Sequence, residues 1–204
     1  MYFVLTFCII GIVSIMPLYF LSLEHLKLQS IFGKEKGIKI AQIFGLISGW
    51  GFFLFLFGIW LSPQPKFNIS ILNYDMILLT FLHYSFNLIH LAISIPLILI
   101  GAWFGIIGVK EITLKVAETH RPEKIIDTGI YTRIRHPQYF GAILSHLGIS
   151  ILLSSLFSLL LTPIIILIIY LMSWKEEKEL LKEFGIEYED YKKKVPMLIP
   201  RLRK

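Results

Sequence analysis

The sequence predicts an all-α, polytopic membrane protein: a helical bundle of about five crossings with a C-terminal helical hairpin and a cytoplasmic helical tail. Hydrophobic residues make up 55% of the 204 residues and the mean hydropathy is +0.71, which is too apolar for an ordinary soluble domain. Apolar runs of spanning length occur at 2–22, 39–61 and 88–109, and a longer run at 139–173 suits a hairpin. All but one of the 20 Lys and Arg residues fall on one side of such a topology.

The first run lacks a basic leader and a small-residue cleavage site, so it is expected to be a retained membrane helix rather than a signal peptide. The positive-inside rule then predicts an outside N-terminus and a cytoplasmic C-terminus, with only Lys66 on the outer side. A basic segment next to a membrane favours anionic lipid headgroups over nucleic acid, so no nucleic-acid partner is expected. Within the hairpin, Ser154 and Ser155 are a plausible bend.

Residues 69–87 divide the chain. The segment is apolar, but a full crossing would move the later basic loops to the other side, so it is expected to be re-entrant or interfacial, or the outer extension of a long tilted helix. We therefore expect residues 1–87 to form N-terminal membrane helices with this segment, and residues 88–204 to form the functional core. The polar residues of the segment are Asn73, Asp75, His83 and Asn87.

Four polar residues around the boundary between residues 87 and 88 are spaced so that they would share one face of a helix: His83, Asn87, His90 and Ser94. Such a stripe could line a substrate cleft or hydrogen-bond between helices, and its two histidines could bind a metal. Interhelical packing is the commoner case, and the remaining histidines show no metal-ligand spacing. No metal site is therefore expected.

Residues 129–141 place a basic, aromatic loop at a predicted membrane boundary. Gly129 allows a turn, and Pro137 keeps His136 out of helical geometry while it can open the next helix. The free N–H groups of that helix, together with Arg135 and His136, suit a carboxylate or phosphate ligand. An equally good interpretation at this level is that the arginines only reach lipid phosphates.

A carboxylate pair follows the hairpin, so the two clusters can meet at the same face of the membrane. Glu177 lies on one helical stripe with Leu181, Phe184, Tyr188 and Tyr191, although Gly185 could break that helix, and Glu176 lies about a quarter-turn away. A carboxylate directed inward needs either an arginine or the hydroxyls of a ligand as its partner. An Arg135–Glu177 ion pair of purely structural role therefore remains an alternative.

The motif Gly129-Ile130-Tyr131 with Arg135-His136-Pro137-Gln138-Tyr139-Phe140-Gly141, the hairpin and Glu176-Glu177 resembles the isoprenylcysteine carboxyl methyltransferase and phospholipid methyltransferase superfamily. The tail from Phe184 to Tyr191, with Val195-Pro196 and Ile199-Pro200, is more similar to the isoprenylcysteine branch. The resemblance covers roughly residues 88–202. It implies an integral-membrane methyltransferase core that uses S-adenosylmethionine and acts on a lipid or lipidated acceptor.

Glu176 and Glu177 are the catalytic candidates as the nearest bases, and Arg133 is a third as the nearest cation for an acceptor carboxylate. The polar stripe gives His83, Asn87 and His90 as the candidates for an acceptor cleft, and the resemblance implies the cofactor-binding residues. Phosphate loops, dinucleotide fingerprints and hydrolase motifs are missing, so the cofactor needs another kind of pocket. The expected cofactor-binding residues are Tyr131, Arg135, His136, Pro137, Tyr139, Gly141, Glu176, Glu177, Tyr188, Pro196 and Pro200.

One position departs from the family pattern. Met172 stands where isoprenylcysteine-type enzymes generally carry an arginine that suits an acceptor carboxylate, and an uncharged methionine cannot neutralise one. The acceptor is therefore open between a prenylcysteine carboxylate and a phospholipid headgroup, and the acidic and aromatic residues suit an amine-bearing lipid. Two other classes stay open: a sterol-type reductase with a reduced nicotinamide cofactor, and a non-enzymatic lipid-binding or transport protein.

Overall fold

The computed structural model describes residues 2–69, 77–81, 84–112 and 124–201, and for 77–81 and 84–86 it describes the backbone. Apart from one two-stranded hairpin, the regular structure of these residues is helical, which confirms the predicted fold class. The elements are α1 (Phe3–Leu23), α2 (His25–Phe32), α3 (Lys34–Leu61), β1 (Ile77–Phe81), β2 (Tyr84–Asn87), α4 (Leu88–Ile112), the 3-10 turn η1 (Gly129–Thr132), α6 (Pro137–Leu152), α7 (Leu156–Leu160), α8 (Thr162–Phe184) and α9 (Ile186–Lys194).

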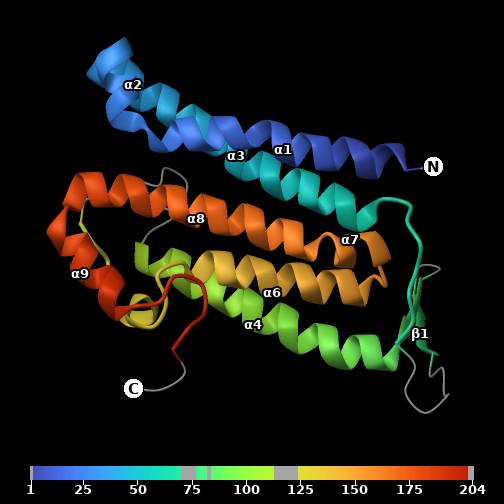
Figure 1. Ribbon diagram of the computed structural model, residues 1–204. Coiled ribbons are helices and arrows are strands. Elements are labelled where there is room, and N and C mark those ends of the chain that lie inside the picture. The colour runs from blue at the N-terminus through green and yellow to red at the C-terminus, as the bar shows by residue number, and fades with distance from the viewer. Residues whose placement is uncertain (1, 70–76, 82–83, 113–123, 202–204) are drawn as a thin grey trace.

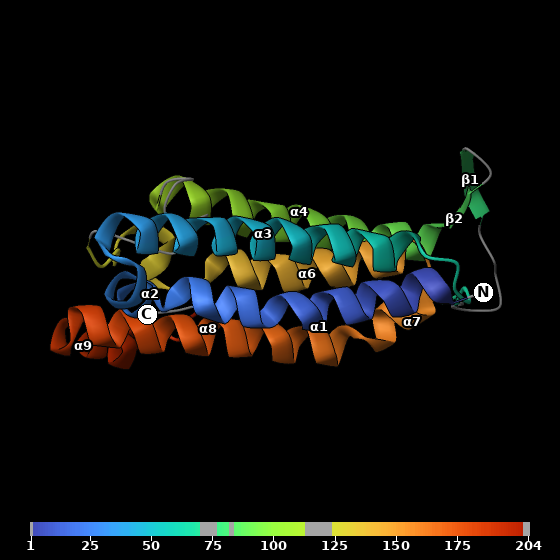
Figure 2. The same cartoon turned by 90° about the horizontal axis from the view of Figure 1, so that it is seen from above.

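The long helices lie side by side as a bundle (Figures 1 and 2). Helices α1 and α3 pack as one pair and α4 and α6 as another, while α8 contacts both α6 and α1. The loop before α6, helix α9 and the C-terminal end of α4 gather at one end of the bundle, and β1 and β2 lie at the other (Figure 1).

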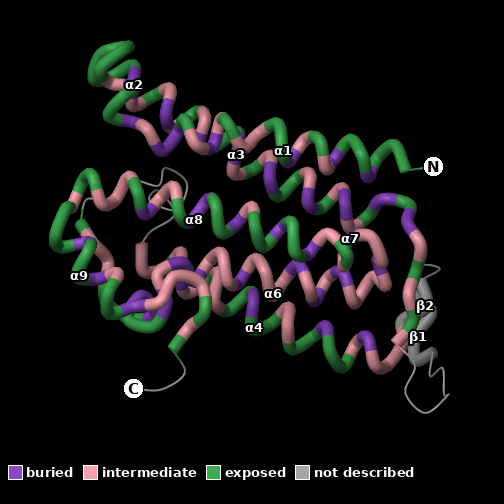
Figure 3. The backbone as a smooth tube through the Cα atoms, viewed as in Figure 1, coloured by how far each residue is buried: buried purple, intermediate pink, exposed green. Residues whose placement is uncertain are grey.

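In the part of the chain that the structure describes, α1, α3 and α4 are long and apolar enough to cross a membrane. Large apolar side chains such as Phe3 and Leu54 are exposed, as expected for surfaces that face lipid. Exposed residues recur along both α1 and α3 (Figure 3). Helix α6 has 16 residues, and α8 is charged after Trp174. The two extra crossings of the hairpin therefore remain a prediction, which the alignment of α6 and α8 with the other helices supports.

The residues before α4 are not a continuation of that helix. β1 and β2 pair in antiparallel fashion, and α4 begins only at Leu88. A helical extension over residues 77–81 and 84–87 is therefore wrong, because these residues form strands instead. A two-stranded hairpin leaves the backbone groups of its outer edges unpaired, which suits a position at the membrane–water interface rather than in the hydrocarbon core.

The α4–α6 contact depends on glycine. A Cβ on Gly141 would lie 2.5 Å from the carbonyl oxygen of Gly101, and one on Gly101 would lie 2.7 Å from that of Gly141. Small residues let membrane helices approach closely, and here they hold the start of α6 against α4. Gly141 therefore serves this packing in the structure.

The ends of the hairpin follow the sequence prediction. Helix α6 starts at Pro137 and ends at Leu152, and Ser154 has a φ of 52° in the bend. Gly185, with a φ of 57°, separates α8 from α9, so the stripe from Glu177 to Tyr191 is divided between two helices. Tyr188 and Tyr191 nevertheless pack against the last turns of α8.

Candidate active site

The loop before α6 is fixed by its own backbone. Gly129 has a φ of 52° and opens η1, and the carboxylate of Glu111 accepts a hydrogen bond from the Ile130 N–H at 2.9 Å. Ile134 is fully buried among apolar side chains of α4 and α6. Arg135 and His136 follow this anchor directly, so they are held at the first turn of α6.

Arg135 forms a two-point ion pair with Glu177. Its Nε and Nη2 donate to the two carboxylate oxygens at 2.6 and 3.0 Å, and both side chains are almost fully buried. Nη1 donates to the backbone carbonyls of Lys192 and Val195. The ion pair that the sequence left open is therefore present, and it connects the loop, α8 and the end of α9.

His136 lies between the two glutamates. Its Nε2 is 3.2 Å from Glu177 Oε1 and its Nδ1 is 3.3 Å from Glu176 Oε2. Burial alone would lower the pKa of His136, but the hydrogen bonds and charges of Glu176 and Glu177 outweigh burial and raise it. Burial would likewise raise the pKa of Glu177, but His136 and Arg135 lower it overall. The cluster thus holds ionised partners of both signs.

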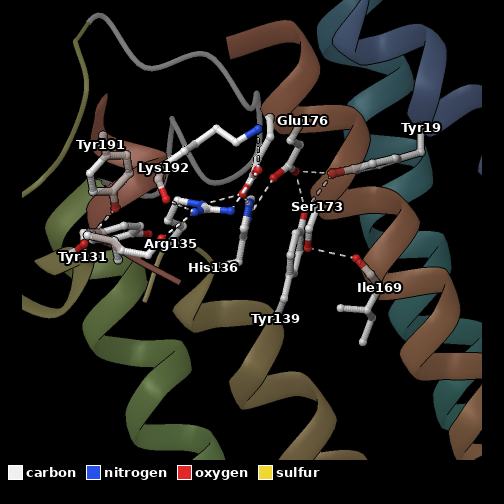
Figure 4. A network of polar contacts seen from close by, with 12 residues as sticks. Tyr19, Tyr131, Arg135, His136, Tyr139, Ile169, Ser173, Glu176, Tyr191 and Lys192 are labelled. Carbon is white, nitrogen blue, oxygen red and sulfur yellow. Dashed lines mark hydrogen bonds and ion pairs between the residues drawn. The ribbon is translucent and has the colours of Figure 1, made fainter. Parts of the chain in front are cut away.

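Glu176 faces two tyrosines. Oε1 accepts hydrogen bonds from the hydroxyls of Tyr139 on α6 and Tyr19 on α1, and these two hydroxyl oxygens are 2.6 Å apart (Figure 4). The ring of Tyr139 stacks on His136 with an interplanar angle of 7°. A residue of the first helix therefore contacts the site.

The C-terminal segment runs alongside the loop. The N–H groups of Arg135 and His136 donate to the carbonyls of Pro196 at 3.0 Å and Met197 at 3.1 Å. The Arg201 N–H donates to the Arg133 carbonyl at 3.1 Å. Arg133 and the proline-containing tail thus support the loop through their backbones.

A pocket with charged side chains in its wall opens at this end of the bundle, and it is called the polar pocket below. Its walls combine carboxylates of α8 (Glu176, Glu179 and Glu183) with apolar and aromatic side chains, and Lys192 contacts the cluster from α9. Several predicted cofactor residues line it: Tyr131, Arg135, His136, Pro137, Tyr139, Glu176 and Tyr188. The predicted residues that do not line it are Arg133, Gly141, Glu177, Pro196 and Pro200. Glu177 instead lies behind the pocket and holds Arg135 and His136.

An apolar cavity of about 320 Å³ adjoins the polar pocket. It lies among α1, α3, α4, α6 and α8, and its lining includes Trp50, Phe53, Met172 and Tyr19. Gln138 and Tyr139 line both spaces, so they form the shared wall. Trp50 and Phe53 are 67% and 55% exposed on the outer surface of α3, so the cavity opens toward the surface that faces lipid.

The predicted acceptor-cleft residues lie elsewhere. His90 Nε2 accepts from the Ile69 N–H at 3.0 Å, and its Nδ1 is 2.9 Å from Ser154 Oγ. Asn87 donates to Asn68 at 2.6 Å, and His83 lies outside the described residues. These contacts belong to the end of the bundle where α4 begins, and neither cavity includes Asn87 or His90 in its lining. In the described ranges, no group of three potential metal ligands comes together.

Sequence reasoning did not find Tyr19 or Gln138. A tyrosine near the end of an apolar run is ordinary in an interfacial aromatic belt, so Tyr19 gave no specific signal. Gln138 lies inside the Arg-His-Pro motif, but at a position to which the sequence assigned no role. Only the packing of α1 and α3 against the core shows that both residues border the cavities.

The fold and site together define a helical membrane protein with a charged pocket beside a lipid-facing cavity. Residues 89–187 match the phospholipid methyltransferase family. Through this region the chain is similar to the superfamily of phospholipid and isoprenylcysteine methyltransferases. No solved structure matches the chain.

The curated relatives that the chain matches are also methyltransferases. The protein-S-isoprenylcysteine O-methyltransferase of Schizosaccharomyces pombe is 34% identical over 92 residues, 41% of this chain and 36% of the relative. The methanethiol S-methyltransferase of Crocosphaera subtropica is 30% identical over 139 residues, 67% of this chain and 53% of the relative. Methanethiol S-methyltransferase 2 of Bradyrhizobium diazoefficiens is 36% identical over 75 residues, 36% of this chain and 27% of the relative. The alignments thus span about half or less of the relatives' own length.

Proposed function

We propose that this protein is an integral-membrane methyltransferase that uses S-adenosylmethionine and methylates a lipophilic acceptor. The observation that carries the proposal is the shared wall of Gln138 and Tyr139 between a polar, charged pocket and a lipid-facing apolar cavity. Two reactants of opposite polarity could meet across such a wall while water is excluded from the reacting atoms. The match to the phospholipid methyltransferase family and the methyltransferase names of the relatives support it.

The polar pocket fits the parts of S-adenosylmethionine. Phe184, Tyr188 and Tyr191 offer aromatic walls for a flat ring, while Glu176 and Glu179 offer acceptors for hydroxyls and a negative charge for a sulfonium. S-adenosylmethionine supplies an electrophilic methyl group on that sulfonium. Arg135, His136 and Glu177 hold each other, so in this proposal they shape the pocket and position Glu176.

The acceptor would enter from the bilayer. The apolar cavity opens beside exposed Trp50 and Phe53, so a lipophilic molecule could reach the shared wall without crossing water. The same arrangement supports a site at the cytoplasmic face, because the polar pocket lies at the end of the bundle where the basic loop and tail gather (Figure 1). In this orientation the N-terminus is outside.

The proposal predicts that Glu176→Gln weakens the binding of S-adenosylhomocysteine. Loss of one charged hydrogen-bond partner costs about 1.5–3 kcal/mol, or roughly tenfold to a hundredfold in Kd. Calorimetric titration of the purified protein in detergent measures this. Glu187→Gln, the same change at an exposed position of α9, is the matched control and should leave the Kd unchanged.

The same titration distinguishes a methyltransferase from a reductase and from a protein that is not an enzyme. Binding of a reduced nicotinamide dinucleotide in place of S-adenosylhomocysteine would indicate a reductase. Binding of neither would contradict an enzyme of either kind. Equal affinity in the wild type and Glu176→Gln would show that the carboxylate does not contact the cofactor.

A further inference from the structure

The apolar cavity reaches the surface of the bundle along α3. Its lining residues on α1 and α8 are buried, and the exposed residues among its described lining all belong to α3: Leu46, Trp50 and Phe53. Gly105 and Val109, which line it from α4, are half-buried. Helices α3 and α4 lie on the side of the bundle opposite α8 (Figure 2). The mouth of the cavity therefore lies between α3 and α4.

Two of the glycines that line the cavity border open space: Gly49 on α3 and Gly105 on α4. A Cβ built on either one would have no described atom within 4 Å. Packing accounts for other glycines of the bundle, since a Cβ on Gly108 would lie 2.9 Å from Gln138 Cγ. Close contact between helices therefore does not require glycine at positions 49 and 105.

Glycine is also the less stable choice at both positions. Gly49 and Gly105 lie well inside α3 and α4, and glycine destabilises the interior of a helix relative to alanine because its backbone loses more freedom on folding. An alanine would fit and would favour each helix. The advantage of glycine must then come from the space that its missing side chain leaves, and this space belongs to the cavity and its mouth.

The cavity is small enough for a single methyl group to matter. Its volume of about 320 Å³ is near the lower end of the range for small-molecule sites, which is roughly 300–1,000 Å³. One methylene more or less in an apolar pocket changes the discrimination between ligands by about 10-fold to 200-fold. Two missing side chains at one mouth can therefore decide which apolar groups enter.

Building on the proposed function, we propose that Gly49 and Gly105 determine the specificity for the acceptor by keeping the mouth open to an apolar group broader than one straight chain. The branched or ring-shaped part of the acceptor lies between the two glycine backbones and against Trp50, while its reactive end lies at the shared wall of Gln138 and Tyr139. A straight chain needs less width and does not depend on the glycines. Neither glycine takes part in methyl transfer itself.

The two glycines come from different parts of the chain. Gly105 lies within the residues that match the phospholipid methyltransferase family, whereas Gly49 lies before them. The N-terminal helices therefore contribute to the choice of acceptor in this proposal, although the charged cluster of Arg135, His136 and Glu177 lies entirely in the core.

The test compares two probes that differ mainly in shape: 1-bromodecane, a straight chain, and 1-bromoadamantane, a cage with the same number of carbon atoms. Purified protein in vesicles is titrated with each probe, and bromine quenching of Trp50 fluorescence is followed, because Trp50 lines the cavity. The quenching that remains in Trp50→Phe is subtracted, and the saturable part gives an apparent Kd. Partition of a probe into the bilayer is the same for every variant, so the ratio of the apparent Kd values reports on the cavity.

The wild type should bind both probes. Gly49→Ala and Gly105→Ala should each raise the apparent Kd of 1-bromoadamantane by about tenfold or more, and that of 1-bromodecane by less than about threefold. Both variants should keep the calorimetric Kd for S-adenosylhomocysteine, because neither glycine lines the polar pocket. The matched control is Gly51→Ala on the same helix, where a Cβ would lie 3.5 Å from Ile15 Cδ1, in ordinary contact and outside the lining of the cavity. It should change neither probe.

Several results would overturn the inference while S-adenosylhomocysteine binding leaves the proposed function intact. A wild type that binds 1-bromodecane alone, or neither probe, would show that the mouth does not admit a broad group. An equal loss for both probes in the alanine variants would indicate a general change in packing, and no loss would show that other residues set the width. A loss in Gly51→Ala as large as in Gly49→Ala would assign the effect to stiffening of α3. Failure of the wild type to bind S-adenosylhomocysteine would instead contradict the proposed function itself.

Discussion

Each end of the bundle buries a polar cluster, and the two clusters differ in charge and in the space around them. At the end with the basic loop, Arg135, His136, Glu176 and Glu177 are ionic partners beside two cavities. At the other end, Trp60 Nε1 donates to His146 Nδ1 at 3.0 Å, which fixes a neutral imidazole tautomer for a residue that is fully buried.

The second cluster continues through neutral groups. Ser150 Oγ and Ser158 Oγ are 2.7 Å apart, and the Ser158 N–H donates to Gln64 Oε1 at 2.9 Å. These bonds connect α6, α7 and the segment after α3, and the two cavities described above do not include them in their linings. Buried polarity in a membrane bundle is therefore not by itself a sign of function. Charge together with an adjoining cavity distinguishes the first cluster.

The two clusters should differ most in how much stability the protein loses when one polar partner is removed, and the largest loss is expected where that partner is charged. Arg135→Met leaves the buried Glu177 with only His136 and Lys192 as ionic partners, and breaking a buried pair costs about 3–5 kcal/mol. We expect a correspondingly lower free energy of unfolding, measured by equilibrium unfolding in mixed micelles. Lys193→Met is the control, because its 3.0 Å contact with Asp190 is exposed to solvent and should contribute little to the free energy of unfolding.

A double variant sharpens this result. Arg135→Met combined with Glu177→Met replaces both charges with apolar groups and should recover much of the loss, because neither member of the buried pair is then left without the other. If the loss of unfolding free energy in the double variant equals the sum of the losses in the two single variants, the loss of the ion pair does not explain the instability of either single variant. The contacts of Arg135 with the carbonyls of Lys192 and Val195 would then explain it.

A smaller effect is expected at the neutral end. Trp60→Phe removes the donor to His146 and should lower the free energy of unfolding by about 1 kcal/mol, since hydrogen bonds between membrane helices contribute modestly. The Kd for S-adenosylhomocysteine, measured by calorimetry on the same sample, should not change. A weakened Kd would mean that the two ends of the bundle are coupled, and the proposed division between structural and functional clusters would fail.

The comparison also shows what the sequence could predict. The apolar runs, Pro137 and the bend at Ser154 predicted the helices, because the cost of unpaired backbone in lipid strongly limits the fold. Helical spacing placed Glu177 on an inward face, but spacing cannot show that Arg135 occupies that carboxylate and leaves Glu176 at the pocket. His90 and His136 are both histidines in or beside apolar runs, so only tertiary contacts separate them.

Tyr19 illustrates the same limit over a longer distance. It is 120 residues from Tyr139 and 157 from Glu176 in sequence, and their contact depends on how α1 docks onto α8. No local pattern encodes that docking, because either face of an apolar membrane helix is compatible with lipid. The motif could therefore predict that the loop before α6 and the carboxylates of α8 come together, whereas the contact with the first helix could not be predicted.

The smallest predicted effect concerns pH. The pKa of His136 is raised above 6.5, so its ionic contacts stabilise the fold fully below about pH 6.5, and this contribution is lost as pH rises through the raised value. The pKa of Glu177 is lowered below 4.5, so its contribution is present above about pH 4.5 and is lost as pH falls through the lowered value. The apparent Tm in detergent should therefore be highest between these limits and decline on both sides.

Two variants test whether His136 causes the fall in Tm at alkaline pH. In a chain of this size, each kcal/mol of lost stability lowers the Tm by about 2–4 °C. His136→Gln should lower the plateau and remove the dependence above pH 6.5, since no proton is then lost from this position. His146→Gln should lower the Tm at every pH without changing the shape of the curve, because His146 Nδ1 accepts a hydrogen bond and the ring is already neutral. If the alkaline decline persists in His136→Gln, the titrating group lies elsewhere and the charged end of the bundle is not the source of the pH dependence.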